Sequence, residues 1–137
     1  MKLYMLDTNI LIYAIKHPLS SVVDCIVDLA VQGKLCISAV TYGELEVGIL
    51  KSAWQEKSRK AVEAILSGIP TLAYDQLAAC WYAKLKTKLE REGTSVGNPD
   101  LMIGGHAAAA GCILVTNNVK HFERMGIAFE DWLNGLR

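Results

Sequence analysis

The sequence contains no long hydrophobic run, although hydrophobic residues make up 52% of its 137 residues. No stretch approaches the roughly 20 apolar residues that a membrane-spanning helix needs. The chain also reaches an acidic residue, Asp7, before any such run, so we expect neither a membrane span nor a signal peptide. Repeats and low-complexity segments are absent as well, and we expect one globular domain over residues 1–137.

An excess of charge of either sign is also lacking, because 14 Lys and Arg residues balance 14 Asp and Glu residues. The overall charge therefore gives no reason to expect nucleic-acid binding, and any such binding would need a local basic patch. Lys84, Lys88 and Arg91 share one face of a predicted helix, and a second group lies at 57–60. Each group has two interpretations, a solvated helix face or a surface that contacts an RNA backbone.

Cysteine pairs of the C-x-x-C type and nucleotide-binding motifs are missing too. The four cysteines, Cys25, Cys36, Cys80 and Cys112, are scattered among apolar residues. We interpret them as reduced core residues of a cytoplasmic protein, not as disulfides or zinc ligands. Neither G-x-G-x-x-G nor G-x-x-x-x-G-K-[ST] occurs, which argues against a nucleotide-binding domain.

Short apolar runs alternate with longer segments of helical periodicity. The predicted strands lie at 3–6, 35–38, 70–74, 112–116 and 127–129. The predicted helices lie at 9–16, 22–33, 40–52, 56–66 and 75–92, with two more beginning near 98 and 118. This alternation predicts an α/β fold with a mostly parallel central sheet of four to five strands flanked by helices. Ligands of such sheets bind beyond the carboxyl ends of the strands, so polar residues there are candidates for a site.

Asp7 directly follows the first predicted strand. An acid at the end of an apolar strand is poorly solvated unless it has a partner. Two interpretations remain open, a helix-capping residue and a functional carboxylate. We favour the second because Asn9 is the better N-cap of the two.

Glu44 also has a local alternative, since Thr41 and Glu44 have the spacing of a capping box. Against that alternative, Glu44, Gly48 and Lys51 share a helical face without large apolar groups. Such a face is expected to border a polar cleft.

Asp100 lies in the first turn of a helix that we expect to begin with Asn98 as its cap and Pro99 at its first position. Small residues at 104–110 would let this helix lie close to the sheet and bring Asp100 near Asp7. Asn118 follows the fourth strand, where it is either a helix cap or a neutral oxygen ligand.

Three carboxylates at one edge of a sheet would repel each other, and a divalent cation is the usual resolution. Carboxylates and waters suit Mg²⁺ or Mn²⁺ better than zinc. Such a site hydrolyses phosphodiester bonds. The alternative that remains is a non-catalytic interaction domain, such as a receiver-like signalling domain, although the lysine that a receiver needs after Thr116 is not found.

Taken in order, four sequence strings resemble a PIN domain and, more narrowly, a VapC-type toxin. They are MLDTNI at 5–10, GNPDLMI at 97–103, LVTNN at 114–118 and the discontinuous set Ile37-Ser38, Thr41 and Glu44-Leu45. The resemblance covers essentially the whole chain. It implies an endoribonuclease that depends on Mg²⁺ or Mn²⁺, with catalytic acids at Asp7, Glu44 and Asp100.

The resemblance further implies a homodimer and a VapB-type antitoxin whose C-terminal segment blocks the cleft. The segment 90–132 is similar to enteric VapC toxins that cut initiator tRNA in the anticodon region. One departure is Asn118, which stands where many PIN domains carry a fourth acid. We therefore count on one tightly bound metal, with Glu123 as a candidate substitute for the missing acid.

Overall fold

The computed structural model of the chain describes residues 2–133. Five parallel strands form one sheet in the order β3-β2-β1-β4-β5. The strands are β1 (Tyr4–Leu6), β2 (Leu35–Ser38), β3 (Thr71–Leu72), β4 (Ile113–Val115) and β5 (Phe129–Glu130). The helices are α1 (Thr8–Lys16), α2 (Ser21–Val31), α3 (Ala39–Lys51), α4 (Gln55–Ile65), α5 (Gln76–Arg91), α6 (Asn98–Ala109) and α7 (Val119–Glu123). The predicted α/β fold with a parallel sheet is confirmed.

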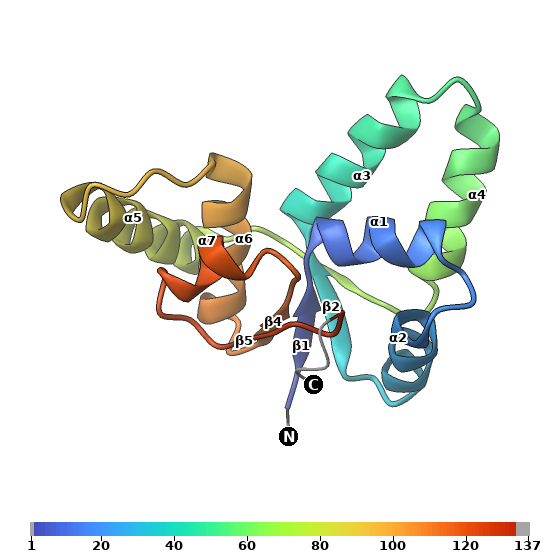
Figure 1. Cartoon of the computed structure of the whole chain (residues 1–137), viewed down its shortest axis with the longest axis horizontal. Helices are drawn as coiled ribbons and strands as arrows, with labels where there is room; N and C mark the ends of the chain where they lie inside the picture. Colours follow the sequence, from blue (N-terminus) through green and yellow to red (C-terminus); the bar gives the residue numbers. More distant parts are fainter. Residues whose placement is uncertain (1, 134–137) are drawn as a thin grey trace.

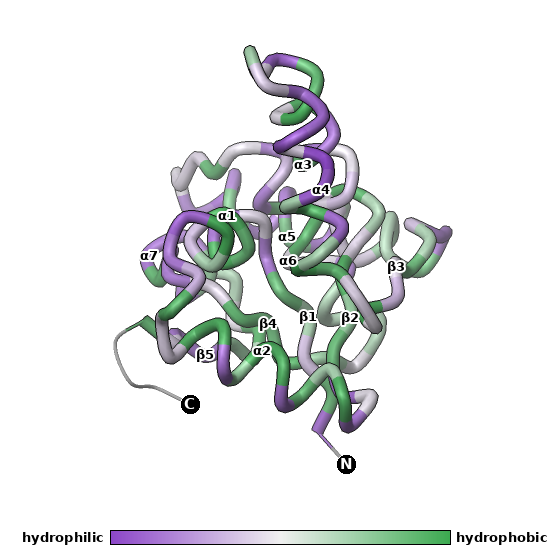
Figure 2. Tube along the Cα trace, turned by 90° about the vertical axis from the view of Figure 1, so that its right-hand side faces the viewer, coloured by the Kyte–Doolittle hydropathy of each residue, from purple (hydrophilic) through white to green (hydrophobic). Residues whose placement is uncertain are grey.

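Helices cover both faces of the sheet, as Figure 1 shows, with α5, α6 and α7 on one side and α1, α2 and α4 on the other. The alternation of side chains along β1 explains this division, because Met5 and Leu6 point to opposite faces. Leu6 packs in a core cluster with α1 and α2, whereas Met5 packs in a second cluster with α5 and α6. In Figure 2 the hydrophobic colour gathers at β2, β4 and α2.

The carboxyl ends of the three central strands meet at one edge of the sheet. Leu6 is in register with Val115, and Met5 is in register with Cys36. Helix α1 begins directly after β1 and α3 begins directly after β2. The side chains that follow these strands therefore lie close together. Helix α3 then runs away from the sheet and α4 returns, so the two form a projecting hairpin (Figure 1).

The small residues of α6 serve a different contact from the one predicted. A Cβ atom on Gly105 would lie 2.8 Å from the backbone nitrogen of Tyr82, so the close approach is to α5 and not to the sheet. A Cβ atom on Gly104 would instead meet Sδ of Met125 at 2.7 Å. Helix α6 is thus held between α5 and the turn after α7.

Several local expectations were wrong. Helix α6 has Gly97 as its N-cap, because Asn98 already has helical geometry, and Asn98 accepts a hydrogen bond from Tyr82. Cys80 is exposed on α5, whereas the other three cysteines are buried as expected, and none of the four forms a disulfide within the described residues. Strand β3 covers only Thr71–Leu72.

Among the described residues, no single helix has the length and apolar character needed to cross a membrane. Only α1 and α2 taken together, with a bend of 117° between them, meet that test.

Candidate active site

Asp7 is the N-cap of α1, which corrects the assignment of that role to Asn9. Its Oδ1 atom accepts a hydrogen bond from the backbone nitrogen of Ile10 at 2.9 Å, while Asn9 is exposed. The side chain of Thr116 also forms a hydrogen bond with the Asp7 carboxylate. Asp7 therefore has the local role that the sequence assigned to its neighbour, and its side chain is buried with only 3% exposed.

The capping role does not satisfy Asp7 electrostatically. The pKa of Asp7 is raised from 3.8 to about 6, mainly by burial and to a smaller extent by the nearby charges of Asp100 and Glu44. The hydrogen bonds from Thr116 and Ile10 act in the opposite direction and are outweighed. A carboxylate that is desolvated and faces two other acids has an environment that favours an added positive charge. The structure thus places Asp100 and Glu44, the other two acids expected at this edge, near enough to Asp7 to act on its charge.

The side chain of Glu44 forms a hydrogen bond with a residue of α1 and has no role in capping α3. The N-cap of α3 is Ser38, whose Oγ atom accepts from the nitrogen of Val40 at 3.1 Å, so the capping-box interpretation is wrong. The hydroxyl of Thr8 instead donates to Oε1 of Glu44 at 2.5 Å. Because Thr8 directly follows Asp7, this bond ties Glu44 to the acid at the end of β1.

Asp100 has two polar partners from α7 and its N-cap. The amide nitrogen of Asn118 lies 3.2 Å from Oδ2 of Asp100, and Nδ1 of His121 lies 2.6 Å from the same oxygen. Asn118 occupies the N-cap position of α7 but makes no side-chain capping bond. Its side chain therefore serves Asp100 and not the helix.

His121 was not among the candidate site residues in the sequence. Its side chain is 43% exposed, yet its ring contacts both Asp100 and Asn118. The spacing of Asn118 and His121, three residues apart on one helix, was the available signal, because such residues share a face. Glu123, the candidate substitute for a fourth acid, is exposed.

The donor atoms at this edge suit a hard cation, since they are carboxylate oxygens. Within the described residues, no three or more His, Cys, Asp or Glu side chains form a group that holds an ion by itself. Mg²⁺ commonly takes one or two carboxylates and keeps several waters, so Asp7 and Asp100 are sufficient protein ligands for it. The burial of Asp7, whose effect on the pKa outweighs that of its two hydrogen bonds, is the observation that supports this fit.

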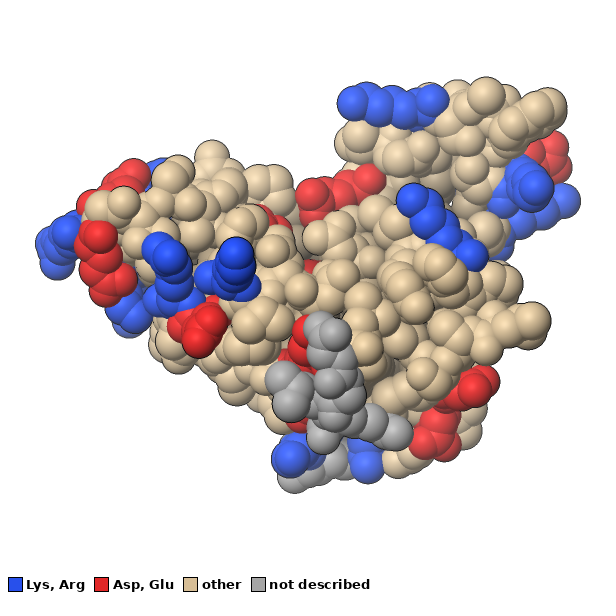
Figure 3. All heavy atoms as spheres, viewed as in Figure 1, with Lys and Arg blue, Asp and Glu red and all other residues tan. Residues whose placement is uncertain are grey.

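A groove beside Glu44 runs between α1, α3 and α4. It was expected to be polar, but most of its lining is apolar and its volume is about 560 Å³. The lining residues are Ile12, Ile15, Lys16, Glu44, Leu45, Gly48, Ile49, Trp54, Lys57, Ser58, Ala61 and Val62. Figure 3 shows acidic side chains in the hollow where α3 and the α5–α7 side of the molecule meet.

One histidine and two of the tryptophans are buried or half-buried. His106 is 3% exposed, and Nδ1 of its ring lies 2.7 Å from Oγ of Ser38. Burial lowers the pKa of His106. Trp132 is buried and Trp81 is half-buried, whereas Trp54 is 75% exposed at the turn between α3 and α4.

Comparison with known proteins agrees with this geometry. The profile of the PIN domain matches residues 4–128. The tRNA(fMet)-specific endonuclease VapC of Shigella flexneri is 45% identical over 130 residues, which cover 94% of this chain and 97% of that protein. The ribonuclease VapC2 of Rickettsia felis is 38% identical, with 95% of this chain and 98% of that protein covered. The chain belongs to the PIN-domain family of VapC ribonucleases.

Solved structures lead to the same family. The VapBC2 complex of Rickettsia felis, bound to a DNA fragment from its promoter, contains a chain that superposes with a TM-score of 0.89 at 35% identity. It covers 95% of this chain and 98% of that one. The DNA-bound VapBC of Salmonella typhimurium gives a TM-score of 0.89 at 39% identity, with 96% and 99% covered. The receiver-like alternative is therefore wrong, and this chain is a VapC-type ribonuclease.

Proposed function

We propose that this VapC-type ribonuclease is the toxin of a toxin–antitoxin pair and cleaves tRNA, with initiator tRNA as the preferred substrate. The observation that carries the proposal is the buried Asp7 carboxylate, whose pKa is raised to about 6 beside Asp100 and Glu44. The name of the Shigella flexneri relative, a tRNA(fMet)-specific endonuclease, supports the choice of substrate.

Asp7 and Asp100 are the proposed ligands of one Mg²⁺ or Mn²⁺ ion. When bound, such an ion neutralises the scissile phosphate and lowers the pKa of the attacking water. Glu44 is less buried than Asp7 and is oriented by Thr8, so we assign it the task of accepting the proton of that water. Asn118 and His121 hold the Asp100 carboxylate in place from α7.

The proposed unit is a single PIN domain over residues 1–137 that acts in the cytoplasm as a homodimer. Its partner is a VapB-type antitoxin whose C-terminal segment covers the acids. The solved structures from Rickettsia felis and Salmonella typhimurium are VapBC complexes, which supports the choice of partner.

Cleavage of purified tRNA tests the function. Initiator tRNA is incubated with the protein in Mg²⁺, in Mn²⁺ and in EDTA, and an elongator tRNA is the control substrate. We expect cleavage of initiator tRNA that needs a divalent ion and that is lost in Asp100→Asn. Cleavage that continues in EDTA would overturn the metal-dependent mechanism, and equal cleavage of both tRNAs would overturn the substrate preference.

A further inference from the structure

Most cations on α5 and α7 have no carboxylate partner, whereas two of the cations on α4 have one. Within the part of the chain that the structure describes, Lys84, Lys88, Arg91, Lys120 and Arg124 have no carboxylate within 4.0 Å. All five side chains are exposed. The cations of this region also outnumber its acids, because residues 76–92 and 119–124 contain six Lys and Arg residues but three Glu residues. A chain with no net charge therefore carries a local positive surface.

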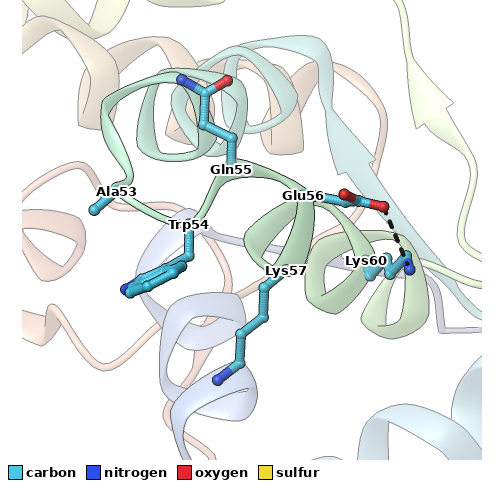
Figure 4. Close-up of a pocket in the computed structure, with 6 residues that line it drawn as sticks. All are labelled: Ala53, Trp54, Gln55, Glu56, Lys57 and Lys60. Carbon is cyan, nitrogen blue, oxygen red and sulfur yellow. Dashed lines mark ion pairs between the residues drawn. The ribbon is translucent and has the colours of Figure 1, made fainter.

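The second basic group, on α4, is largely neutralised. Arg59 lies 2.6 Å from Glu46, and Lys60 lies 3.6 Å from Glu56. The close-up in Figure 4 shows the pair between Lys60 and Glu56, and Trp54 beside Lys57 at the start of the helix. In the α4 group only Lys57 lacks a carboxylate within 4.0 Å, whereas all three cations that the sequence singled out on α5 lack one.

The free cations connect to the acidic edge through α7. His121 lies against Asp100, and Arg124 follows His121 by one turn. The ammonium group of Lys88 donates to the backbone oxygen of Arg124 at 3.5 Å, which joins the end of α7 to the middle of α5. Exposed residues thus lead from Asp100 along α7 to α5, and Figure 3 shows Lys and Arg side chains over these two helices with acidic side chains among them.

The surface on α5 has the form of a shallow groove along the helix. Its lining consists of Ala83, Lys84, Thr87, Lys88 and Arg91. Four residues of a helix rise about 6 Å, which is of the order of the separation between successive backbone phosphates. Ala83 and Thr87 lie beside the cations and are exposed.

We propose that Lys84, Lys88, Arg91 and Arg124 form a basic track that holds the phosphate backbone of the RNA substrate on one side of the acids. The proposal rests on the proposed function for the identity of the ligand. RNA fits this surface because the cations are exposed, have no carboxylate partner and, on α5, share one face of the helix. The track contributes affinity without base specificity, since phosphate contacts position a nucleic acid and do not read its sequence.

Binding of tRNA at several salt concentrations tests the track. The triple variant Lys84→Gln, Lys88→Gln, Arg91→Gln is made in the Asp7→Asn background, so that binding is measured without cleavage. Three lost phosphate contacts should reduce the slope of log K against log salt by about two and weaken binding on the order of 10-fold or more. The matched control, Lys2→Gln, Lys34→Gln, Lys60→Gln, removes two cations that precede β1 and β2, at the opposite edge of the sheet from the acids, and one that pairs with Glu56, and it should leave the slope unchanged.

A second measurement separates the track from the proposed function. In the Asp7-containing protein, the α5 triple variant should raise KM for tRNA and leave kcat within about twofold, while its melting temperature matches that of the wild type. An unchanged salt slope, or equal slopes for the two triple variants, would overturn the track even if tRNA is cleaved. Failure to cleave any tRNA, with the slope reduced as expected, would overturn only the proposed function. A variant that loses binding to an acidic peptide but not to tRNA would show that the surface serves a protein partner instead.

Discussion

Nδ1 of His121 lies 2.6 Å from Oδ2 of Asp100, and this contact joins α7 to the first turn of α6. The imidazole fixes one oxygen of a carboxylate that we assign to metal binding. Groups that orient a metal ligand in this way typically contribute 10- to 100-fold to metal affinity or activity.

We therefore expect His121→Ala to weaken Mg²⁺ binding about 10-fold. His121→Asn, which keeps a polar group near Asp100, should lose less. Thermal shifts over a Mg²⁺ titration measure both variants. Tighter Mg²⁺ binding by His121→Ala would show that the imidazole competes with the ion and does not position its ligand.

Asp7→Asn should stabilise the metal-free protein at neutral pH. Because the pKa of Asp7 is raised from 3.8 to about 6, its proton is held more tightly in the folded than in the unfolded chain. The wild-type free energy of unfolding therefore falls as pH rises from about 4 to 6, and the loss is complete above that window. The shift corresponds to at most about 3 kcal/mol. Asparagine still accepts from Ile10, so the α1 cap survives.

Urea unfolding in EDTA at about pH 4.5 and pH 8 measures this difference. The advantage of Asp7→Asn over the wild type should grow between the two pH values. Asp7→Ala is the control that removes the cap and should be less stable than Asp7→Asn at both. If Asp7→Asn loses as much stability as the wild type when the pH rises, Asp7 is not the group responsible for the loss.

Glu44→Gln should abolish tRNA cleavage without affecting the fold. Glutamine still accepts a hydrogen bond from Thr8 but is a poor proton acceptor, and general bases typically contribute 10²- to 10⁴-fold to rate. Glu46→Gln is a matched control on the same helix, since Glu46 pairs with Arg59 and does not belong to the trio of active-site acids. Single-turnover cleavage rates compare the two, and wild-type cleavage by Glu44→Gln would remove Glu44 from the chemistry.

Asn118→Asp should have opposite effects with and without metal. It replaces the amide that donates to Asp100 with an anion, so the metal-free melting temperature should fall by about 4 °C if the repulsion costs about 1 kcal/mol. In Mn²⁺ the added carboxylate should enlarge the thermal shift. Asn117→Asp, at an exposed neighbouring position, adds the same charge as a control. Equal Mn²⁺ shifts in the two variants would exclude a metal-site role for position 118.

Gly105→Ala should destabilise the protein more than Gly104→Ala. The new Cβ at 105 would lie 2.8 Å from the backbone nitrogen of Tyr82, and overpacking of this kind typically costs about 1 to 3 kcal/mol. At 104 the nearest atom is Sδ of Met125, a flexible side chain that can move aside. Urea unfolding of both variants measures the difference, and equal stabilities would show that α5 and α6 adjust freely.

The strands and the approximate position of the acids could be predicted from the sequence because both depend on local pattern. An apolar run followed by Asp7 indicates a strand that ends in a carboxylate, whatever the rest of the chain does. The identity of the capping residues could not be predicted, since Asp7 and Asn9 are both good caps and only the exit angle of β1 decides between them.

Contacts between distant segments could not be predicted from the sequence either, because they too depend on how the helices leave the strands. The bond from Thr8 to Glu44 depends on how α1 and α3 leave neighbouring strands. The contact of His121 with Asp100 depends on the packing of α6 against α7. The spacing of His121 from Asn118 shows that the two share a helix face, but it does not show that Asp100 lies opposite that face.

Asp7 caps α1, and Asp100 lies in the first turn of α6. The N-terminal end of a helix carries roughly half a positive charge, so each acid faces a helix dipole that partly balances it. The backbone thus supplies part of the counter-charge before any ion arrives. The acidic edge is accordingly preorganised. A chelator should therefore inactivate the enzyme reversibly while leaving its fold in place. Rebinding of the ion should need little rearrangement of the chain.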